Sequence, residues 1–244
     1  MDEPPGLPVN EGSEGHTIKA YDGALTDLRQ RAHAMGGLVA GQVETAVQAL
    51  LESDGAAAEL VLRREQQINA WQTEIEGESF RLLARQAPVA SDLRLVAAVL
   101  HTIHHVERIG DLTVNIAKMV PLMGEPPAGA EEIIAKVEAA GNQARDQIRQ
   151  AHVAFKQRNV NLAENLVSQD DVIDRLNRQV FREAVEIGTD EHAREWGAHV
   201  MLVARYIERI GDNTVDIGEQ IAFVVSGEFR EFTDASHPGG VAAS

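Results

Sequence analysis

The spacing of hydrophobic residues along the chain predicts six long helices and no strands. Hydrophobic positions recur every three or four residues over long stretches, and nowhere do they alternate with a period of two over a useful length. Each half of the chain contains three such stretches, separated by short breaks rich in Gly, Pro, Asn or Asp. We expect helices over residues 25–51, 56–84, 91–120, 130–156, 161–187 and 190–225. Ser91 or Asp92 is expected to cap the third of them.

The strongest break in the pattern divides the chain into two units of similar size. It contains Pro126 and Pro127 between Gly124 and Gly129, and adjacent prolines stop a helix because they lack a backbone donor. The two ends of the chain are rich in Gly, Pro and polar residues and carry few candidates for a core. The predicted organisation is a disordered tail at 1–16, a three-helix bundle at 17–122, a linker at 123–130, a second three-helix bundle at 131–228 and a disordered tail at 229–244.

The third helix of each half shows which of its sides is buried. Its hydrophobic and threonine positions are spaced alternately by three and four residues, which is typical of a helix in the core of a bundle. These positions are Leu95, Val99, Thr102, Val106, Ile109, Thr113, Ile116 and Val120 in the first half, and Val200, Val203, Ile207, Ile210, Thr214, Ile217 and Ile221 in the second. The predicted fold is therefore all-α, with two tandem, pseudo-symmetric three-helix bundles.

A repeated segment shows that the two halves are copies of one unit. The sequence Glu-Arg-Ile-Gly-Asp occupies residues 107–111 and recurs unchanged at residues 208–212. The match continues beyond it, because Thr-Val follows at residues 113–114 and again at residues 214–215. We infer that whatever this segment does is done twice.

The repeated segment places carboxylates side by side on the last helix of each half. With Ile109 in the core, Glu107 and Asp111 fall on the opposite, outward side, one helical turn apart; Glu208, Asp212 and Asp216 form the same row in the second half. Like charges at this spacing repel by a few tenths of a kcal/mol per pair. Each glycine costs about 1 kcal/mol relative to alanine in a helix. Such costs, carried twice, indicate a compensating gain.

The middle helices carry a second acidic pair that matches this row. Asp170 and Asp174 lie one turn apart in the second half, and Glu65 and Asn69 take their places in the first. If the middle and last helices are neighbours, the two rows face each other along one groove. Oxygen ligands from two helices suit a divalent or trivalent metal ion or a small cluster. The candidate metal ligands are Glu65, Glu107, Asp111, Asp170, Asp174, Glu208, Asp212 and Asp216. The alternative is an ordinary solvated acidic surface.

Charge and composition restrict the partners. The formal net charge of −16 disfavours nucleic acid, whose binding depends on Lys and Arg. No run of about 18–20 apolar residues is present, so we expect no membrane insertion. The chain has no Cys, which fits a reducing compartment, and its first ten residues lack the features of a secretion signal. A cytoplasmic protein is the expectation.

Other candidate sites are weaker. His101 and His105 are one turn apart and could hold a metal with His104 nearby, but the second half has Leu202 and Tyr206 at the two matching positions. We interpret these histidines as surface residues. The chain has no Glu-x-x-His pair, phosphate-binding loop or nucleophile elbow, so we expect no enzyme activity. A metal-binding carboxylate enzyme and a purely structural helical protein remain the alternatives.

These features resemble the PhoU family. The resemblance covers about residues 16–227, including residues 35–39, the connection at residues 86–94 and, most specifically, both Glu-Arg-Ile-Gly-Asp segments. It implies two pseudo-symmetric three-helix bundles in the bacterial cytoplasm, a homodimer, and a negative regulator of the phosphate-starvation response. The implied partners are a phosphate ABC transporter and a sensor histidine kinase, which such a protein connects. The resemblance also implies iron or zinc clusters on the (Glu/Asp)-x-x-x-Asp pairs.

The two halves differ in their candidate ligands. Asn69 stands where the second half has Asp174, and Asn115 stands where it has Asp216. The first half therefore offers fewer anionic ligands, and the sequence predicts weaker metal binding there.

Overall fold

The computed structural model describes residues 11–232, and the side chains from residue 21 onward, as six helices without a strand in that range. This confirms the predicted all-α fold. The helices are α1 (Glu11–Glu52), α2 (Gly55–Gln86), α3 (Ala90–Met123), α4 (Glu131–Gln157), α5 (Val160–Glu186) and α6 (Glu191–Ser226).

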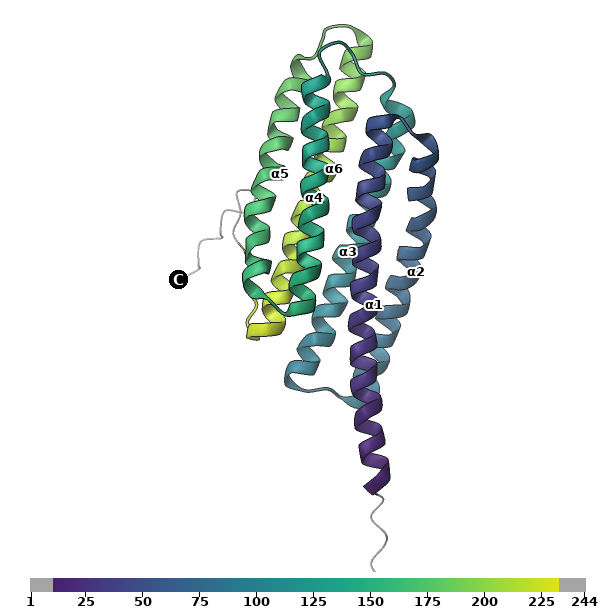
Figure 1. Cartoon of the computed structure of the whole chain (residues 1–244), viewed down its shortest axis with the longest axis vertical. Coiled ribbons are helices and arrows are strands. Elements are labelled where there is room, and N and C mark those ends of the chain that lie inside the picture. The colour runs from purple at the N-terminus through teal and green to yellow at the C-terminus, as the bar shows by residue number, and fades with distance from the viewer. Residues whose placement is uncertain (1–10, 233–244) are drawn as a thin grey trace, which may run out of the picture.

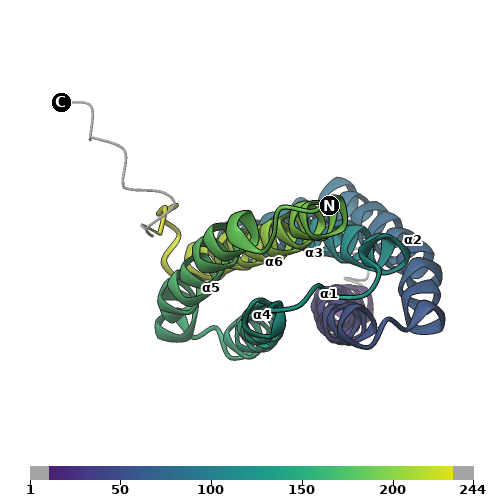
Figure 2. The ribbon, with the colours of Figure 1, turned by 90° about the horizontal axis from the view of Figure 1, so that it is seen from above.

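The six helices form two layers (Figure 2). Helices α5, α6, α3 and α2 stand side by side in a curved row, and α4 and α1 cover one face of it. The two halves meet along α3 and α6 in one layer and along α1 and α4 in the other, and both of these central pairs are antiparallel (Figure 1). The middle helix of each half, α2 or α5, therefore lies at the outer edge.

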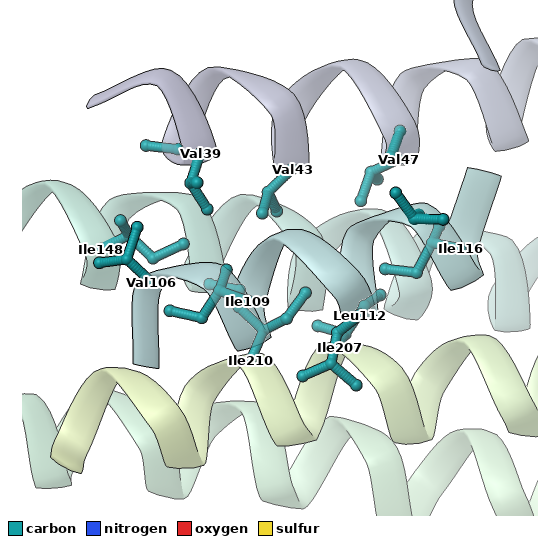
Figure 3. Close-up of a cluster of buried hydrophobic side chains, with 14 of the residues drawn as sticks. Val39, Val43, Val47, Val106, Ile109, Leu112, Ile116, Ile148, Ile207 and Ile210 are labelled. Atoms are coloured by element: carbon teal, nitrogen blue, oxygen red, sulfur yellow. The ribbon is translucent and has the colours of Figure 1, made fainter. Parts of the chain in front are cut away.

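One hydrophobic core runs through both halves. On the α3 side, Val106, Ile109 and Leu112 lie against Ile207 and Ile210 of α6, and valines of α1 close the cluster from the other layer (Figure 3). Burying an aliphatic side chain of this size contributes about 1.5–3 kcal/mol before the entropy cost is counted. The two bundles are thus fused by a common core.

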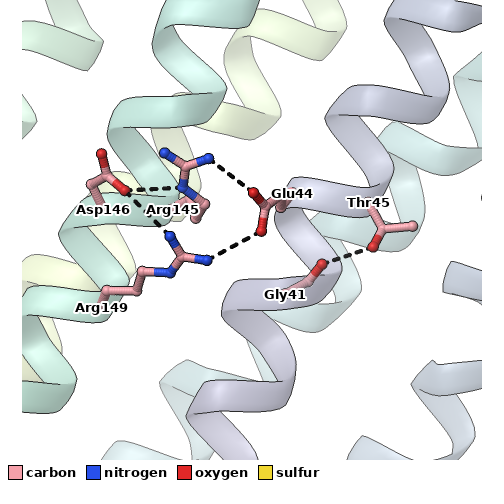
Figure 4. Close-up of polar contacts among 6 residues, drawn as sticks. All are labelled: Gly41, Glu44, Thr45, Arg145, Asp146 and Arg149. Atoms are coloured by element: carbon pink, nitrogen blue, oxygen red, sulfur yellow. Dashed lines mark hydrogen bonds and ion pairs between the residues drawn. The ribbon is translucent and has the colours of Figure 1, made fainter.

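Polar contacts also join the halves where α1 meets α4. Glu44 of α1 accepts from Arg145 at 3.0 Å and from Arg149 at 3.2 Å, and Asp146 lies 2.9 Å from Arg145 (Figure 4). These groups are partly exposed, so their contribution to stability is small.

Equivalent contacts recur in the two halves and fix their correspondence. The Gln42 side chain donates to the Val61 carbonyl at 2.8 Å, and Gln147 donates to the Leu166 carbonyl at 3.1 Å. Both members of the second pair lie 105 positions after those of the first. Helices α1 and α2 therefore correspond to α4 and α5 with this offset, whereas the repeated segments relate α3 to α6 with an offset of 101.

The ends of the chain differ from the expected disordered tails. Helix α1 begins at Glu11, within the segment 1–16, and no proline after Pro8 interrupts it. After α6, the backbone N–H of Phe232 donates to Glu219 at 2.7 Å, so residues 229–232 return to the helix instead of leaving it. Residues 1–10 and 233–244 of the two predicted tails lie outside the described residues.

The predicted cap of the third helix is wrong. Val89 occupies the N-cap of α3 and makes no side-chain capping bond. Asp92 lies in the first turn instead, where it accepts a hydrogen bond from the Tyr21 hydroxyl at 3.2 Å. The physical reason is that α3 begins at Ala90, so Ser91 and Asp92 already lie inside its first turn and neither stands at the cap position.

Candidate functional site: two carboxylate clusters

The middle and last helices of each half are neighbours, as the sequence required for a shared acidic groove. We call the group formed by Glu65 of α2 with Glu107 and Asp111 of α3 the first carboxylate cluster. The second carboxylate cluster joins Asp170 and Asp174 of α5 to Glu208 and Asp212 of α6.

The glycine of each repeated segment makes room for a carboxylate of the neighbouring helix. A Cβ atom at Gly110 would lie 2.9 Å from Glu65 Oε2, and one at Gly211 would overlap Asp170 Oδ1. An isoleucine one turn after each carboxylate packs on the same glycine. The helix cost of these glycines is therefore offset by close approach of a carboxylate to the α3 or α6 backbone.

The second cluster is buried, which corrects the expectation that its row faces outward and does not fit the alternative of a solvated acidic surface. Asp170, Asp174 and Glu208 are 1%, 4% and 5% exposed. Helix α6 packs against α3, α4 and α5, so the side opposite its core seam faces α5 and not solvent. In the first cluster Glu107 is half-buried and Asp111 is exposed, because α2 packs less extensively against α3 than α5 packs against α6.

Negative charge accumulates in the first cluster. Burial, followed by the charges of Asp111 and Glu107, raises the pKa of Glu65 to about 7. Burial and Asp111 also raise the pKa of Glu107. Both Glu65 oxygens are buried without a well-formed hydrogen bond, and the nearby Asn69 amide lowers the pKa only in part. The folded protein therefore favours a proton or a cation at this position.

The second cluster carries its own arginines. Burial, followed by the charge of Asp212, raises the pKa of Glu208 to about 7, although Arg205 contacts Glu208 directly. Arg178 donates to Asp174 at 3.1 Å. Thr73 and His104 stand at the positions that correspond to the two arginines, so the first cluster has no arginine at either place.

Sequence reasoning missed three residues that contact the second cluster. Arg178 follows Asp174 by four residues and Arg205 precedes Glu208 by three, spacings at which helical side chains meet, so a signal for both was present. Gln147 lies 3.5 Å from Asp170 through its side-chain nitrogen and is fully buried. No spacing or motif within α4 predicts that Gln147 contacts the site.

Asp216 and the histidine cluster lie where α6 meets α3. Asp216 approaches His105 at 3.4 Å, and Nδ1 of the same histidine lies 3.2 Å from Asn213 Oδ1. His105 is half-buried in this contact, whereas His101 and His104 are exposed as surface residues would be. Asp216 belongs to the predicted row, but its carboxylate contacts His105 of the other half.

The donor chemistry of both clusters fits a hard or borderline metal ion. Carboxylates repel one another there, and Glu65 has buried oxygens available. Among the described residues, however, no three Asp, Glu or His side chains converge closely enough in this arrangement to hold one ion. Binding would require the carboxylates to turn toward one another and, in the second cluster, Arg178 and Arg205 to move aside.

Glu65→Gln is expected to raise the free energy of unfolding by about 1–2 kcal/mol at pH 8 and to change it little near pH 4. The folded-state pKa of Glu65, about 7, lies above the reference value of 4.5. Its ionised form therefore costs stability above pH 7, and this cost disappears as the pH falls through the window from 7 to 4.5. Because Glu65 is partly exposed, solvent screening makes the stability gain smaller than the full pKa shift of Glu65 would give.

Urea denaturation of chelator-treated protein at several pH values measures this difference. Glu74→Gln, at an exposed site of the same helix, serves as the control. A gain from Glu65→Gln that is equal at pH 5 and pH 8 would contradict the assignment.

Both halves of the chain match the model of one protein family. The model of the PhoU domain matches residues 32–120 and 137–221, one stretch in each half. The chain belongs to the PhoU family. Members of this family are regulatory accessory proteins, so the expectation that the chain is not an enzyme is confirmed.

Individual relatives agree with the family match. Two relatives are named phosphate-specific transport system accessory protein PhoU homolog. The one from Pseudomonas putida is 35% identical, and the alignment covers 95% of this chain and 89% of the relative. The one from Pseudomonas aeruginosa is 34% identical, and the alignment covers 95% of this chain and 94% of the relative. The crystal structure of PhoU from Pseudomonas aeruginosa superposes with a TM-score of 0.80 at 33% identity, over 85% of this chain and all of that one. PhoU from Streptococcus pneumoniae gives 0.79 at 27% identity, over 86% of this chain and 99% of that one.

No helix in the described part of the chain is long and apolar enough to cross a membrane. The family match and the relatives together identify the protein as a PhoU-family accessory protein of phosphate transport.

Proposed function

We propose that this protein acts in the cytoplasm as a negative regulator of the phosphate-starvation response. In this role it connects a phosphate ABC transporter to a sensor histidine kinase and works as a homodimer. The match of the PhoU domain in both halves carries the proposal, and the names of the relatives place them in a phosphate-specific transport system. The acidic surface supports docking to basic regions of partner proteins, mainly through faster association.

The carboxylate clusters serve this function as metal sites. Glu65, Glu107 and Asp111 would hold an ion in the first half, and the four residues of the second carboxylate cluster would hold one in the second, as iron, zinc or a small cluster of either. A bound cation would compensate the burial and mutual repulsion that raise the pKa values of Glu65 and Glu208. It would also fasten α2 to α3 and α5 to α6, because each cluster takes ligands from both helices.

Depletion of the protein from its own host tests the regulatory role. In phosphate-rich medium, a phosphate-starvation reporter is expected to rise to the level normally reached in starvation, because the signal that holds the response off is lost. Re-expression of the chain from a plasmid is the control and should restore repression. An unchanged reporter, together with unchanged phosphate uptake, would contradict the proposal and favour a purely structural helical protein.

A further inference from the structure

A groove on the outer surface of the second half combines apolar and basic side chains. It lies between α5 and α6, has a volume of about 970 Å³, and is lined by Phe181, Met201 and Leu202 together with three arginines. Phe181 is 57% exposed and Leu202 is 46% exposed. The arginines are Arg178, Arg182 and Arg205. We call this feature the α5–α6 groove.

The first half does not repeat the arginines or the aromatic side chain of this groove. The positions that correspond to the three arginines are occupied by Thr73, Gly77 and His104, and Glu76 replaces Phe181. The chain as a whole has a net charge of −16, with 22 Lys and Arg against 38 Asp and Glu. The fold is common to both halves, so it does not by itself account for three arginines and Phe181 at these positions.

Two arginines of the groove are held in place by buried carboxylates of the second carboxylate cluster. Arg178 is bound to the buried Asp174 and Arg205 to the buried Glu208, yet the side chain of each arginine is 57% exposed. Arg182 is exposed and donates to the Arg178 carbonyl at 3.3 Å. Each of the two anchored guanidinium groups uses one nitrogen inward, which leaves other donors directed to solvent. Anchoring reduces the entropy lost when these groups bind a ligand.

We propose that the α5–α6 groove docks an amphipathic helix of a partner protein, with apolar side chains on one face and Asp or Glu beside them. The apolar residues of that helix would lie against Phe181, Met201 and Leu202, and its carboxylates would meet the arginines. Nucleic acid and anionic membranes fit less well, because the rest of the chain repels them. A single inorganic anion would leave the apolar part of the groove unused. The inference goes beyond the proposed function and concerns the metal-free protein, in which Asp174 and Glu208 anchor the two arginines.

Binding of a synthetic peptide to the full chain tests the proposal. The probe is a fluorescent helical peptide of about 18 residues, with Leu and Phe on one face and Glu on both sides of it. We expect saturable binding that Arg182→Glu and Phe181→Ser each weaken by about tenfold. Both side chains are exposed, so the folded structure should survive, and circular dichroism checks this. Arg81→Glu is the matched control, because Arg81 is exposed and Glu186 stands at the corresponding position.

Several outcomes would overturn the proposal. They are the absence of saturable binding, equal binding of a peptide with Lys in place of Glu, and equal weakening by Arg81→Glu. Binding of inorganic phosphate or anionic vesicles that depends on Arg182 while the acidic peptide does not bind would assign the groove to another ligand. Concentration-dependent self-association that Phe181→Ser abolishes, without peptide binding, would assign it to a second copy of the chain.

Discussion

Replacing Gly211 with alanine is expected to destabilise the protein by about 1–3 kcal/mol, the usual cost of overpacking a buried site. The new methyl group would overlap Asp170, which is 1% exposed, so the closely packed residues around it would have to shift to relieve the overlap. Gly110→Ala should cost less. Its methyl group would lie 2.9 Å from the end of Glu65, a longer side chain that is only partly buried. Urea denaturation compares the two variants.

Gly41→Ala is the control for the substitution itself. Gly41 lies inside α1 with nothing within 4 Å of an added Cβ atom. Alanine has the higher helix propensity, so this variant should gain up to about 1 kcal/mol. Equal effects at Gly211 and Gly41 would show that the repeated glycine does not accommodate a carboxylate.

Neutralising the second cluster is expected to remove the larger share of metal binding. In the double variant Asp170→Asn with Glu208→Gln, affinity in the second half should fall at least tenfold, since even supporting residues of metal sites have effects of about 10–100-fold. The corresponding variant of the first half, Glu65→Gln with Glu107→Gln, should remove less. The physical reason is that the first cluster has Asn69 in place of a fourth carboxylate.

Titration of chelator-treated protein with Fe²⁺ or Zn²⁺ measures this difference, and the protein must be prepared without a metal-binding tag. The structure adds a competing effect, because Arg178 and Arg205 must leave their carboxylates before an ion binds. The variant Arg178→Gln tests how large this competing effect is, and it should strengthen metal binding in the second half. Equal occupancy of both halves in the unaltered protein, or a metal content at background, would contradict the prediction.

The helices and the pairing of the acidic rows could be predicted from sequence because both depend on periodicity. The spacing around Ile109 and Ile210 identified the buried seams, and the duplicated segment identified the two units. Burial of Glu208 could not be predicted in the same way. It depends on how α5 and α6 approach each other, which is set by Gly211 and by contacts between residues far apart in sequence.

The differences between the halves were also only partly visible. The sequence showed Asn69 and Asn115, but it gave no reason to connect Gln147 of α4 with Asp170 of α5. The contact of Asp216 with His105 joins residues from opposite halves, so no pattern within one helix predicts it. A structure was needed for these two contacts, because they join residues on different helices that no repeated spacing relates.

The carboxylate clusters are central to the proposed regulation, and one measurement tests that claim most directly. The chromosomal gene is replaced by a variant that carries Glu107→Gln, Asp111→Asn, Glu208→Gln and Asp212→Asn, and a phosphate-starvation reporter is read in phosphate-rich medium. With the variant present at the normal level, we predict derepression as strong as after depletion of the protein. Full repression by this variant at the same protein level would contradict the claim that the clusters carry the function.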